Sequence, residues 1–196
     1  MSKKQNRYTS WNVKLILLLA TTLFLAIGCT QKNSSVENNS TPLRLTSTAF
    51  EDNGRIDMKY TKRDQNISIP LAWNKAPMGT KSFAIVTYDL HPVANNWIHW
   101  AIVDIPASVL SLEEGVSKTD KLPKGSKELH NSFGLKGYDG PQPPAGSGDH
   151  EYKTILFALD VKTLDIQNSR LTFDNFQKLV EEHIIDSAEI SGFYEN

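Results

Sequence analysis

The sequence contains very little cysteine and has no excess of basic charge. Cys29 is the only cysteine among 196 residues, so the chain has no second cysteine for an internal disulfide. The 21 lysine and arginine residues against 22 acidic residues argue against a strongly basic nucleic-acid-binding protein. Neither an internal repeat nor a Gly-Xaa-Ser-Xaa-Gly nucleophile motif is present. Hydrophobic residues at 39% and aromatic residues at 9% are typical of a globular protein.

The N-terminal end carries basic residues without any acid. Lys3, Lys4 and Arg7 precede two apolar stretches, Leu15–Ala20 and Leu23–Ile27. A spanning helix needs about 20 apolar residues, so these stretches are short for one and are typical of a secretory signal peptide.

The signal-like segment ends in Leu25-Ala26-Ile27-Gly28-Cys29, which resembles the lipobox of bacterial lipoproteins. In that motif the cysteine is acylated and becomes the new N-terminus. We therefore predict a lipoprotein signal peptide over residues 1–28, with Cys29 as the lipidation site. The alternative is a plain membrane anchor that ends in a chance cysteine. Residues 29–42 are polar and predict a lipid-anchored flexible tether, which leaves residues 43–196 as one domain.

The domain has mainly the patterns of β-strands. Apolar runs predict strands at Leu43–Ser47, Ile67–Trp73, Ser82–Tyr88, Ile98–Ile105 and Tyr152–Val161. One helix is predicted near the end, where Phe173, Phe176, Val180 and Ile184 recur at helical spacing behind Thr172. Strands dominate without regular βαβ alternation, which favours a mainly β fold with antiparallel sheets and a peripheral helix.

The connection from Ser111 to Gly148 is rich in glycine and proline. Structureless connections of this length are uncommon and are usually functional. It leads into His150 at a strand start, while Asp89 ends an earlier strand. By strand alternation alone, His99 shares a face with Ala101 and Val103 and is a core histidine. Polar groups at strand ends beside such a loop are nevertheless typical of a pocket for a small anion or polar ligand.

Several motifs follow one another along the domain. They are Ala72-Trp73, Trp97-Ile98-His99-Trp100, Asn131-Ser132-Phe133-Gly134, the run Gly137–Tyr152 and Ile190-Ser191-Gly192-Phe193-Tyr194. Together they resemble the phosphatidylethanolamine-binding protein (PEBP) family, in particular its bacterial Raf-kinase-inhibitor-like branch. The resemblance implies a β-sandwich of two antiparallel sheets with short peripheral helices. It also implies a shallow pocket that accepts phosphate or a phosphoethanolamine head group.

The resemblance further implies which residues bind the ligand. Carried over by position, they are Asp89, Trp97, His99, Gly140, Pro143, Pro144, His150 and Tyr152. Imidazole N–H groups and a tyrosine hydroxyl are suitable donors for phosphate oxygens. The chain departs from the family where His91 replaces a second acid, and we place His91 at the pocket rim.

These observations predict a ligand-binding module anchored in the bacterial cell envelope, outward of the cytoplasmic membrane. Its expected partner is a phosphate-containing small molecule or lipid head group, and modulation or inhibition of a partner protein is a further expectation. We expect no cofactor, no nucleic-acid partner and no metal site, because Asp89, His91 and His99 match no zinc spacing. The alternative is a phosphoester or acyl hydrolase with Asp89, His99 and His150 as acid/base groups, for which no nucleophile stands out.

The anchoring prediction is tested by replacing the lipidation site. We expect Cys29→Ser to abolish lipid-linked processing and to move the protein out of the detergent phase on phase separation. Because Thr30 follows the cysteine instead of the aspartate associated with inner-membrane retention, a bacterium with two membranes should carry the wild-type protein on its outer membrane. A wild-type protein without acyl chains in mass spectrometry would contradict the prediction.

Overall fold

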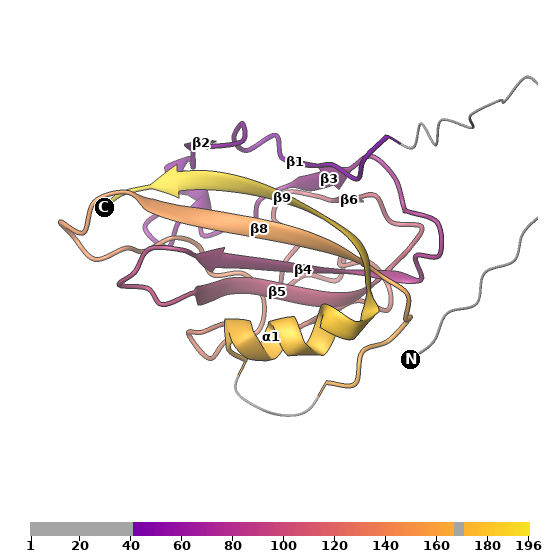
Figure 1. Cartoon of the computed structure of the whole chain (residues 1–196). Helices are drawn as coiled ribbons and strands as arrows, with labels where there is room; N and C mark the ends of the chain where they lie inside the picture. The colour runs from indigo at the N-terminus through magenta and orange to yellow at the C-terminus, as the bar shows by residue number, and fades with distance from the viewer. Residues whose placement is uncertain (1–40, 167–170) are drawn as a thin grey trace, which may run out of the picture. The chain divides into compact units, whose positions relative to one another are not determined.

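Figure 1 shows the computed structural model, which describes residues 41–166 and 171–196. The predicted signal peptide, Cys29 and most of the predicted tether lie outside these residues. The strands are β1 (Leu45–Thr46), β2 (Gly54–Arg55), β3 (Leu71–Trp73), β4 (Ser82–Asp89), β5 (Trp97–Pro106), β6 (Ser111–Leu112), β7 (Lys127–Glu128), β8 (His150–Leu159) and β9 (Ile184–Tyr194). The helices are α1 (Phe173–Val180) and two short 3-10 turns, Met58–Tyr60 and Glu181–His183. No helix in the described part of the chain is long and apolar enough to cross a membrane.

The described strands form two sheets, which confirms the predicted mainly β architecture. The smaller sheet has the order β1-β3-β6, and the larger one has the order β2-β9-β8-β4-β5-β7. Neighbouring strands in the described sheets are antiparallel except the two-residue strand β2, which pairs in parallel with β9. The long strands β4, β5, β8 and β9 supply most of the strand residues of the described chain (Figure 1).

Two apolar clusters cover the two faces of the larger sheet. Phe83 and Ile85 of β4 pack in one cluster with Trp73 of the smaller sheet. On the opposite face, Val86 packs in a second cluster with Phe176 of α1, which lies below β5 in the view of Figure 1. A strand that is covered on both faces needs apolar residues at successive positions. This requirement explains why β4 and β5 stand out in the sequence as continuous apolar runs.

The predicted helix is correct in its first part and wrong at its end. Thr172 caps it by accepting a hydrogen bond from the backbone N–H of Asn175 at 3.2 Å, and Phe176 and Val180 are buried. Ile184, however, is the first residue of β9, separated from α1 by a 3-10 turn. Its spacing of four residues from Val180 imitates helical periodicity, although the chain has already changed direction.

A β-bulge at Asp104 interrupts the pairing of β4 with β5. Phe83 pairs with Ile105 and Ile85 with Ile102, so two residues of β5 lie opposite Ala84. Asp104 is buried and has a φ of 58°, in the left-handed region that aspartate and asparagine tolerate better than most residues. Its carboxylate accepts a hydrogen bond from the backbone N–H of Leu164 at 2.9 Å. The bulge thereby attaches the connection after β8 to the centre of the sheet.

We expect Asp104→Ala to lower the free energy of unfolding by about 2 kcal/mol, because a buried N–H loses its acceptor and alanine is strained at this φ. Asp104→Asn is the matched control, since it retains an acceptor oxygen and the tolerance for the left-handed region. It should cost less than about 1 kcal/mol. Urea denaturation of the three proteins measures the difference, and equal losses for both variants would contradict this account.

Candidate ligand-binding site

Three neighbouring strands of the larger sheet begin or end at the same place. Strand β4 lies between β5 and β8, and its last residue, Asp89, pairs with both Trp97 of β5 and Tyr152 of β8. Because all three strands run antiparallel to their neighbours, the end of β4 meets the beginnings of β5 and β8. This register brings side chains together that are 63 positions apart in the sequence.

Asp89 and Tyr152 reach the same face by regular alternation, whereas His99 reaches it through a second bulge. Thr87 pairs with Trp100 and Tyr88 with Ile98, which leaves His99 as the extra residue of β5. A bulge changes the face toward which the following side chains point. The expectation that His99 shares a face with Ala101 and Val103 is therefore wrong, because these two pack under α1 while His99 contacts Tyr152.

His99 is held in a defined tautomer by the long connection. Its Nδ1 atom lies 2.7 Å from the carbonyl oxygen of Asp139 and 3.1 Å from that of Gly140. Carbonyl oxygens only accept hydrogen bonds, so Nδ1 carries the proton and Nε2 of the neutral ring is an acceptor. Complete burial lowers the pKa of His99, although the carbonyls and the charge of Asp89 oppose this effect. At neutral pH the side chain therefore contributes an acceptor, not a positive charge.

Asp139 fixes the connection that meets His99. Its carboxylate accepts hydrogen bonds from Asn66 at 2.9 Å and Asn131 at 2.8 Å and lies near Lys62 and Lys118. Burial alone raises the pKa of Asp139, but these hydrogen bonds and charges outweigh burial and hold its pKa below the usual value. The segment is thus anchored on several sides.

Gly140 acts through its small size. A Cβ atom at this position would lie 1.9 Å from the carbonyl oxygen of Tyr60, so only glycine fits. Its backbone N–H donates to Asn66 at 2.8 Å, and its carbonyl accepts from His99. Gly140 does not line the cavity described below, and its effect on the site passes through His99.

A buried chain of hydrogen bonds joins β4 and β8. His150 is fully buried, and its Nδ1 donates to Asp89 Oδ2 at 2.6 Å. On the other side of the ring, Nε2 lies 2.8 Å from the hydroxyl oxygen of Ser147. Asp89 Oδ1 accepts from the backbone N–H of His91 at 2.9 Å, and the His91 ring stacks on His150 with centroids 3.9 Å apart. Both carboxylate oxygens and both imidazole nitrogens therefore have partners.

Two hydrogen-bond donors at the site have no such partner. The indole Nε1 of Trp97 and the hydroxyl of Tyr152 are buried without a hydrogen-bond partner. Burial raises the pKa of Tyr152, and the nearby Asp89 carboxylate raises it further through its charge and as a poorly aligned acceptor for the hydroxyl, so the hydroxyl keeps its proton. Buried donors without partners are uncommon in proteins because each costs about 1–3 kcal/mol, and these two belong to residues that line one cavity.

These side chains surround a cavity of about 220 Å³. Its lining is Asp89, Val93, Ala94, Trp97, His99, Phe133, Gln142, Pro143, Pro144, His150 and Tyr152. Seven of the eight residues carried over by resemblance line it, and Gly140 is the exception. The sequence analysis did not name Val93, Ala94, Phe133 or Gln142 as ligand residues. Phe133 lies in the Asn131–Gly134 motif, which was the available signal for it.

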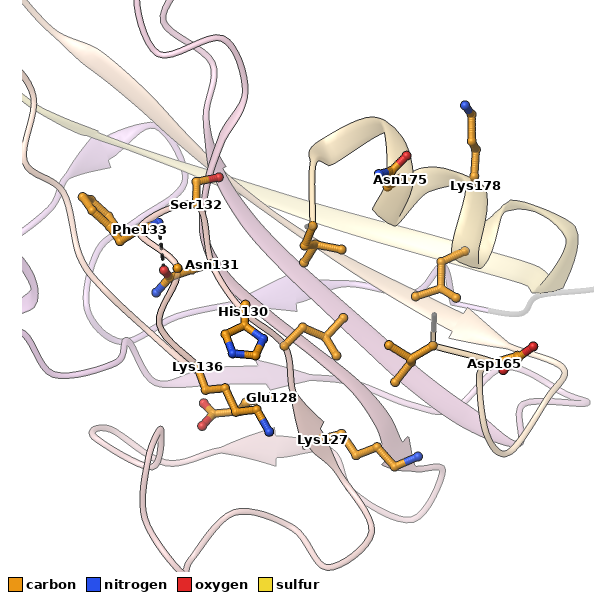
Figure 2. A pocket seen from close by; sticks show the side chains of 15 residues that line it. Lys127, Glu128, His130, Asn131, Ser132, Phe133, Lys136, Asp165, Asn175 and Lys178 are labelled. Carbon is orange, nitrogen blue, oxygen red and sulfur yellow. Dashed lines mark hydrogen bonds between the residues drawn. The ribbon is translucent and has the colours of Figure 1, made fainter. Parts of the chain in front are cut away.

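Another, larger hollow lies between α1 and the segment that follows β7, as Figure 2 shows, and has a volume of about 1000 Å³. Lys127, Lys136 and Lys178 lie around it, and Leu129 and Leu179 form part of its apolar wall. None of the eight predicted ligand residues lines it. Phe133 is common to both hollows, so the ring lies between them.

The described residues contain no group of three or more His, Cys, Asp or Glu side chains that could hold a metal ion. Asp89 and His150, the closest acid and imidazole of the site, already bond to each other. The small cavity therefore offers hydrogen-bond donors and acceptors, with no cluster of metal ligands.

Comparisons with known proteins place this geometry in a family. Residues 46–195 match the model of the phosphatidylethanolamine-binding proteins. A UPF0098 protein of Methanothermobacter thermautotrophicus is 38% identical over 152 residues, which cover 78% of this chain and 98% of the relative. A Mycobacterium tuberculosis protein named "Putative lipoprotein LppC" is 33% identical over 120 residues, which cover 61% of this chain and 57% of the relative.

The fold agrees with the sequence match. The crystal structure of Escherichia coli YbcL, described as a new member of the mammalian PEBP family, superposes with a TM-score of 0.73 and 29% identity. The superposition covers 80% of this chain and 99% of YbcL. With the family model matched over nearly the whole described body and the sandwich fold shared, the chain belongs to the phosphatidylethanolamine-binding protein family.

Proposed function

We propose that the 220 Å³ cavity binds a phosphate group, either free or as part of a small head group such as phosphoethanolamine. The observation that carries this proposal is the pair of buried, unpartnered donors, Trp97 Nε1 and the Tyr152 hydroxyl. Phosphate oxygens accept hydrogen bonds and can satisfy both donors. The cavity volume corresponds to about seven water molecules, which suits a small head group and leaves no room inside for attached acyl chains.

The remaining polar groups favour a ligand that also carries donors. Asp89 is acidic, and Nε2 of neutral His99 is an acceptor, so both repel a fully deprotonated phosphate. A protonated phosphate oxygen can donate to His99 Nε2, and an ammonium group can bond to Asp89. A zwitterion such as phosphoethanolamine satisfies both requirements, and a free phosphate monoanion satisfies the first.

The protein is further proposed to be a lipoprotein of the bacterial envelope. The lipobox-like sequence before Cys29 supports this, and so does the relative named as a lipoprotein. Modulation of a partner protein and membership of the Raf-kinase-inhibitor-like branch stay predictions from the sequence resemblance.

The Tyr152 hydroxyl provides a clean test of the cavity. Tyr152→Phe removes one donor, and we expect about a tenfold to hundredfold weaker affinity for phosphoethanolamine, the range of a hydrogen bond to a charged group. The variant should be at least as stable as the wild type, because the hydroxyl is buried without a partner. Isothermal titration calorimetry and thermal unfolding measure the two quantities.

Tyr138→Phe is the matched control for this variant. Its hydroxyl is also buried, but it donates to the carbonyl of Tyr60 at 2.7 Å, and the residue does not line the cavity. This variant should lose about 1 kcal/mol of stability and keep the wild-type affinity. An unchanged affinity in Tyr152→Phe would place the ligand elsewhere.

The protonation state of His99 predicts how binding depends on pH. Because burial lowers its pKa, the free protein holds His99 neutral at pH 7, and a phosphate oxygen at Nε2 requires an additional proton on the ligand or the ring. Binding therefore takes up a proton, and affinity should rise as pH falls from about 8 to 6, by about tenfold per pH unit at most.

His99→Asn tests whether this proton is the cause. The asparagine amide can still donate to the Asp139 and Gly140 carbonyls, but it has no counterpart of Nε2. The affinity of the His99→Asn variant for phosphoethanolamine should vary less with pH than that of the wild type. An affinity that rises with pH in the wild type, or an equal pH dependence in both proteins, would refute the assignment.

A further inference from the structure

We infer that Ser147, His150 and Asp89 form an acyl-transfer site, in which Ser147 is the nucleophile toward small carboxylic esters. The inference shares His150 and Asp89 with the proposed phosphate site. It does not depend on phosphate binding, because Ser147 does not line the small cavity and phosphate plays no part in the step.

Two short contacts join the three side chains. The Ser147 hydroxyl oxygen lies 2.8 Å from Nε2 of His150, and Nδ1 of the same ring lies 2.6 Å from Asp89. Both distances fall within the range of about 2.6–3.2 Å that joins nucleophile, base and orienting acid in serine hydrolases. The two contacts use opposite nitrogens of one ring, which is the arrangement that proton transfer from the serine requires.

The ring is fixed in a way that suits a base. Asp89 accepts a hydrogen bond from the Nδ1–H group, so Nε2 of the neutral ring has a lone pair directed at Ser147. The His91 ring stacks on one side of His150, and the backbone N–H of His91 holds the other oxygen of Asp89. Asp89 is thus a positioning residue that selects the tautomer and the orientation of the base.

Ser147 itself is accessible. It is half-buried at the end of the long connection, between Gly146 and Gly148, whereas His150 is fully buried. Its hydroxyl hydrogen has two acceptors, the carbonyl of Pro144 at 2.6 Å and Nε2 of His150. Rotation of the hydroxyl hydrogen alone directs it to the base, without movement of the backbone.

The reaction then follows in two balanced halves. Ser147 Oγ forms a bond to the ester carbonyl carbon, its proton passes to His150 Nε2, and the carbonyl electron pair moves to oxygen. The intermediate collapses, the bond to the alcohol oxygen breaks, and His150 returns the proton to the departing alcohol. Water then attacks the acyl-serine in the same manner and releases the carboxylic acid, so no further reagent is needed.

The neighbouring cavity favours a short acyl group. His150 and Pro144, which both contact the Ser147 hydroxyl, also line the 220 Å³ cavity. Its walls include apolar Val93, Ala94 and Pro143. An acetyl or propionyl group is compatible with this volume, and a long fatty acyl chain is not.

The experiment uses p-nitrophenyl acetate with the full chain. We expect a burst of one p-nitrophenol per chain, with a mass increase of one acetyl group on the peptide that contains Ser147. Ser147→Ala should lose both the burst and the modification. Ser187→Ala is the matched control, since Ser187 is exposed on β9 and has no imidazole partner among the described residues, and it should behave as the wild type.

Two further variants separate the roles of base and positioning residue. His150→Gln should slow acylation about a hundredfold, the usual effect of removing a general base. Asp89→Asn should lower the maximal acylation rate and leave the half-saturating ester concentration unchanged. Circular dichroism shows whether each variant is folded. An unfolded variant would differ from both expectations, because it would lose the acylation of Ser147 and also the saturation of the rate by the ester.

Phosphoethanolamine binding, measured on the same samples, distinguishes this inference from the proposed function. Ser147→Ala should bind it like the wild type. Acetylation confined to lysines, or an equal burst in Ser147→Ala, overturns the acyl-transfer site even when phosphoethanolamine binds. A wild-type protein that acylates Ser147 but binds no phosphoethanolamine supports the acyl-transfer site and overturns only the phosphate proposal.

Discussion

The hydrogen bonds of Asp139 hold the long connection against the larger sheet, and the geometry of the site depends on them. The backbone N–H of Asp139 donates to the carbonyl of His99, and its own carbonyl accepts from the His99 ring. Its carboxylate meanwhile accepts from Asn66 and Asn131. A single residue therefore connects a central strand with two separate loops. Other bonds hold the rest of the connection from β6 to β8, but those of Asp139 fix the glycine-flanked part that meets His99.

Two bulges in β5 place side chains where the regular alternation of a strand would not. One moves His99 from the face under α1 to the face that carries Tyr152 and Asp89. The other gives Asp104 the left-handed backbone from which it holds Leu164. Both bulges lie opposite β4, which is paired along its whole length with β8 on its other side. The local loss of pairing is thus supported by a rigid surrounding sheet.

The site combines satisfied and unsatisfied polar groups in one buried place. Asp89 and His150 have partners for each of their polar atoms and are rigid as a result. Trp97 and Tyr152 retain donors with no partner in the protein. A preformed cavity with a few free donors binds a ligand without reorganising its walls, so little entropy is lost on binding. The same rigidity maintains the alignment of Ser147 with its neighbouring imidazole.

The sequence by itself determined the strands that are buried on both faces, since Ser82–Asp89 and Trp97–Pro106 must be apolar at successive positions to fill two clusters. It also located most cavity residues, because they lie in ordered motifs. It did not reveal two-residue strands such as β2, which exist only through their partners, or β9, whose first residue continued the helical spacing. Only the tertiary structure decided the face of His99, the steric reason for Gly140 and the contact of Ser147 with His150. The first depends on a bulge, the second on an approach between distant segments, and the third on the local turn around Gly146 and Gly148, which places Ser147 against His150 three positions later. None of these leaves a periodic signal in the chain.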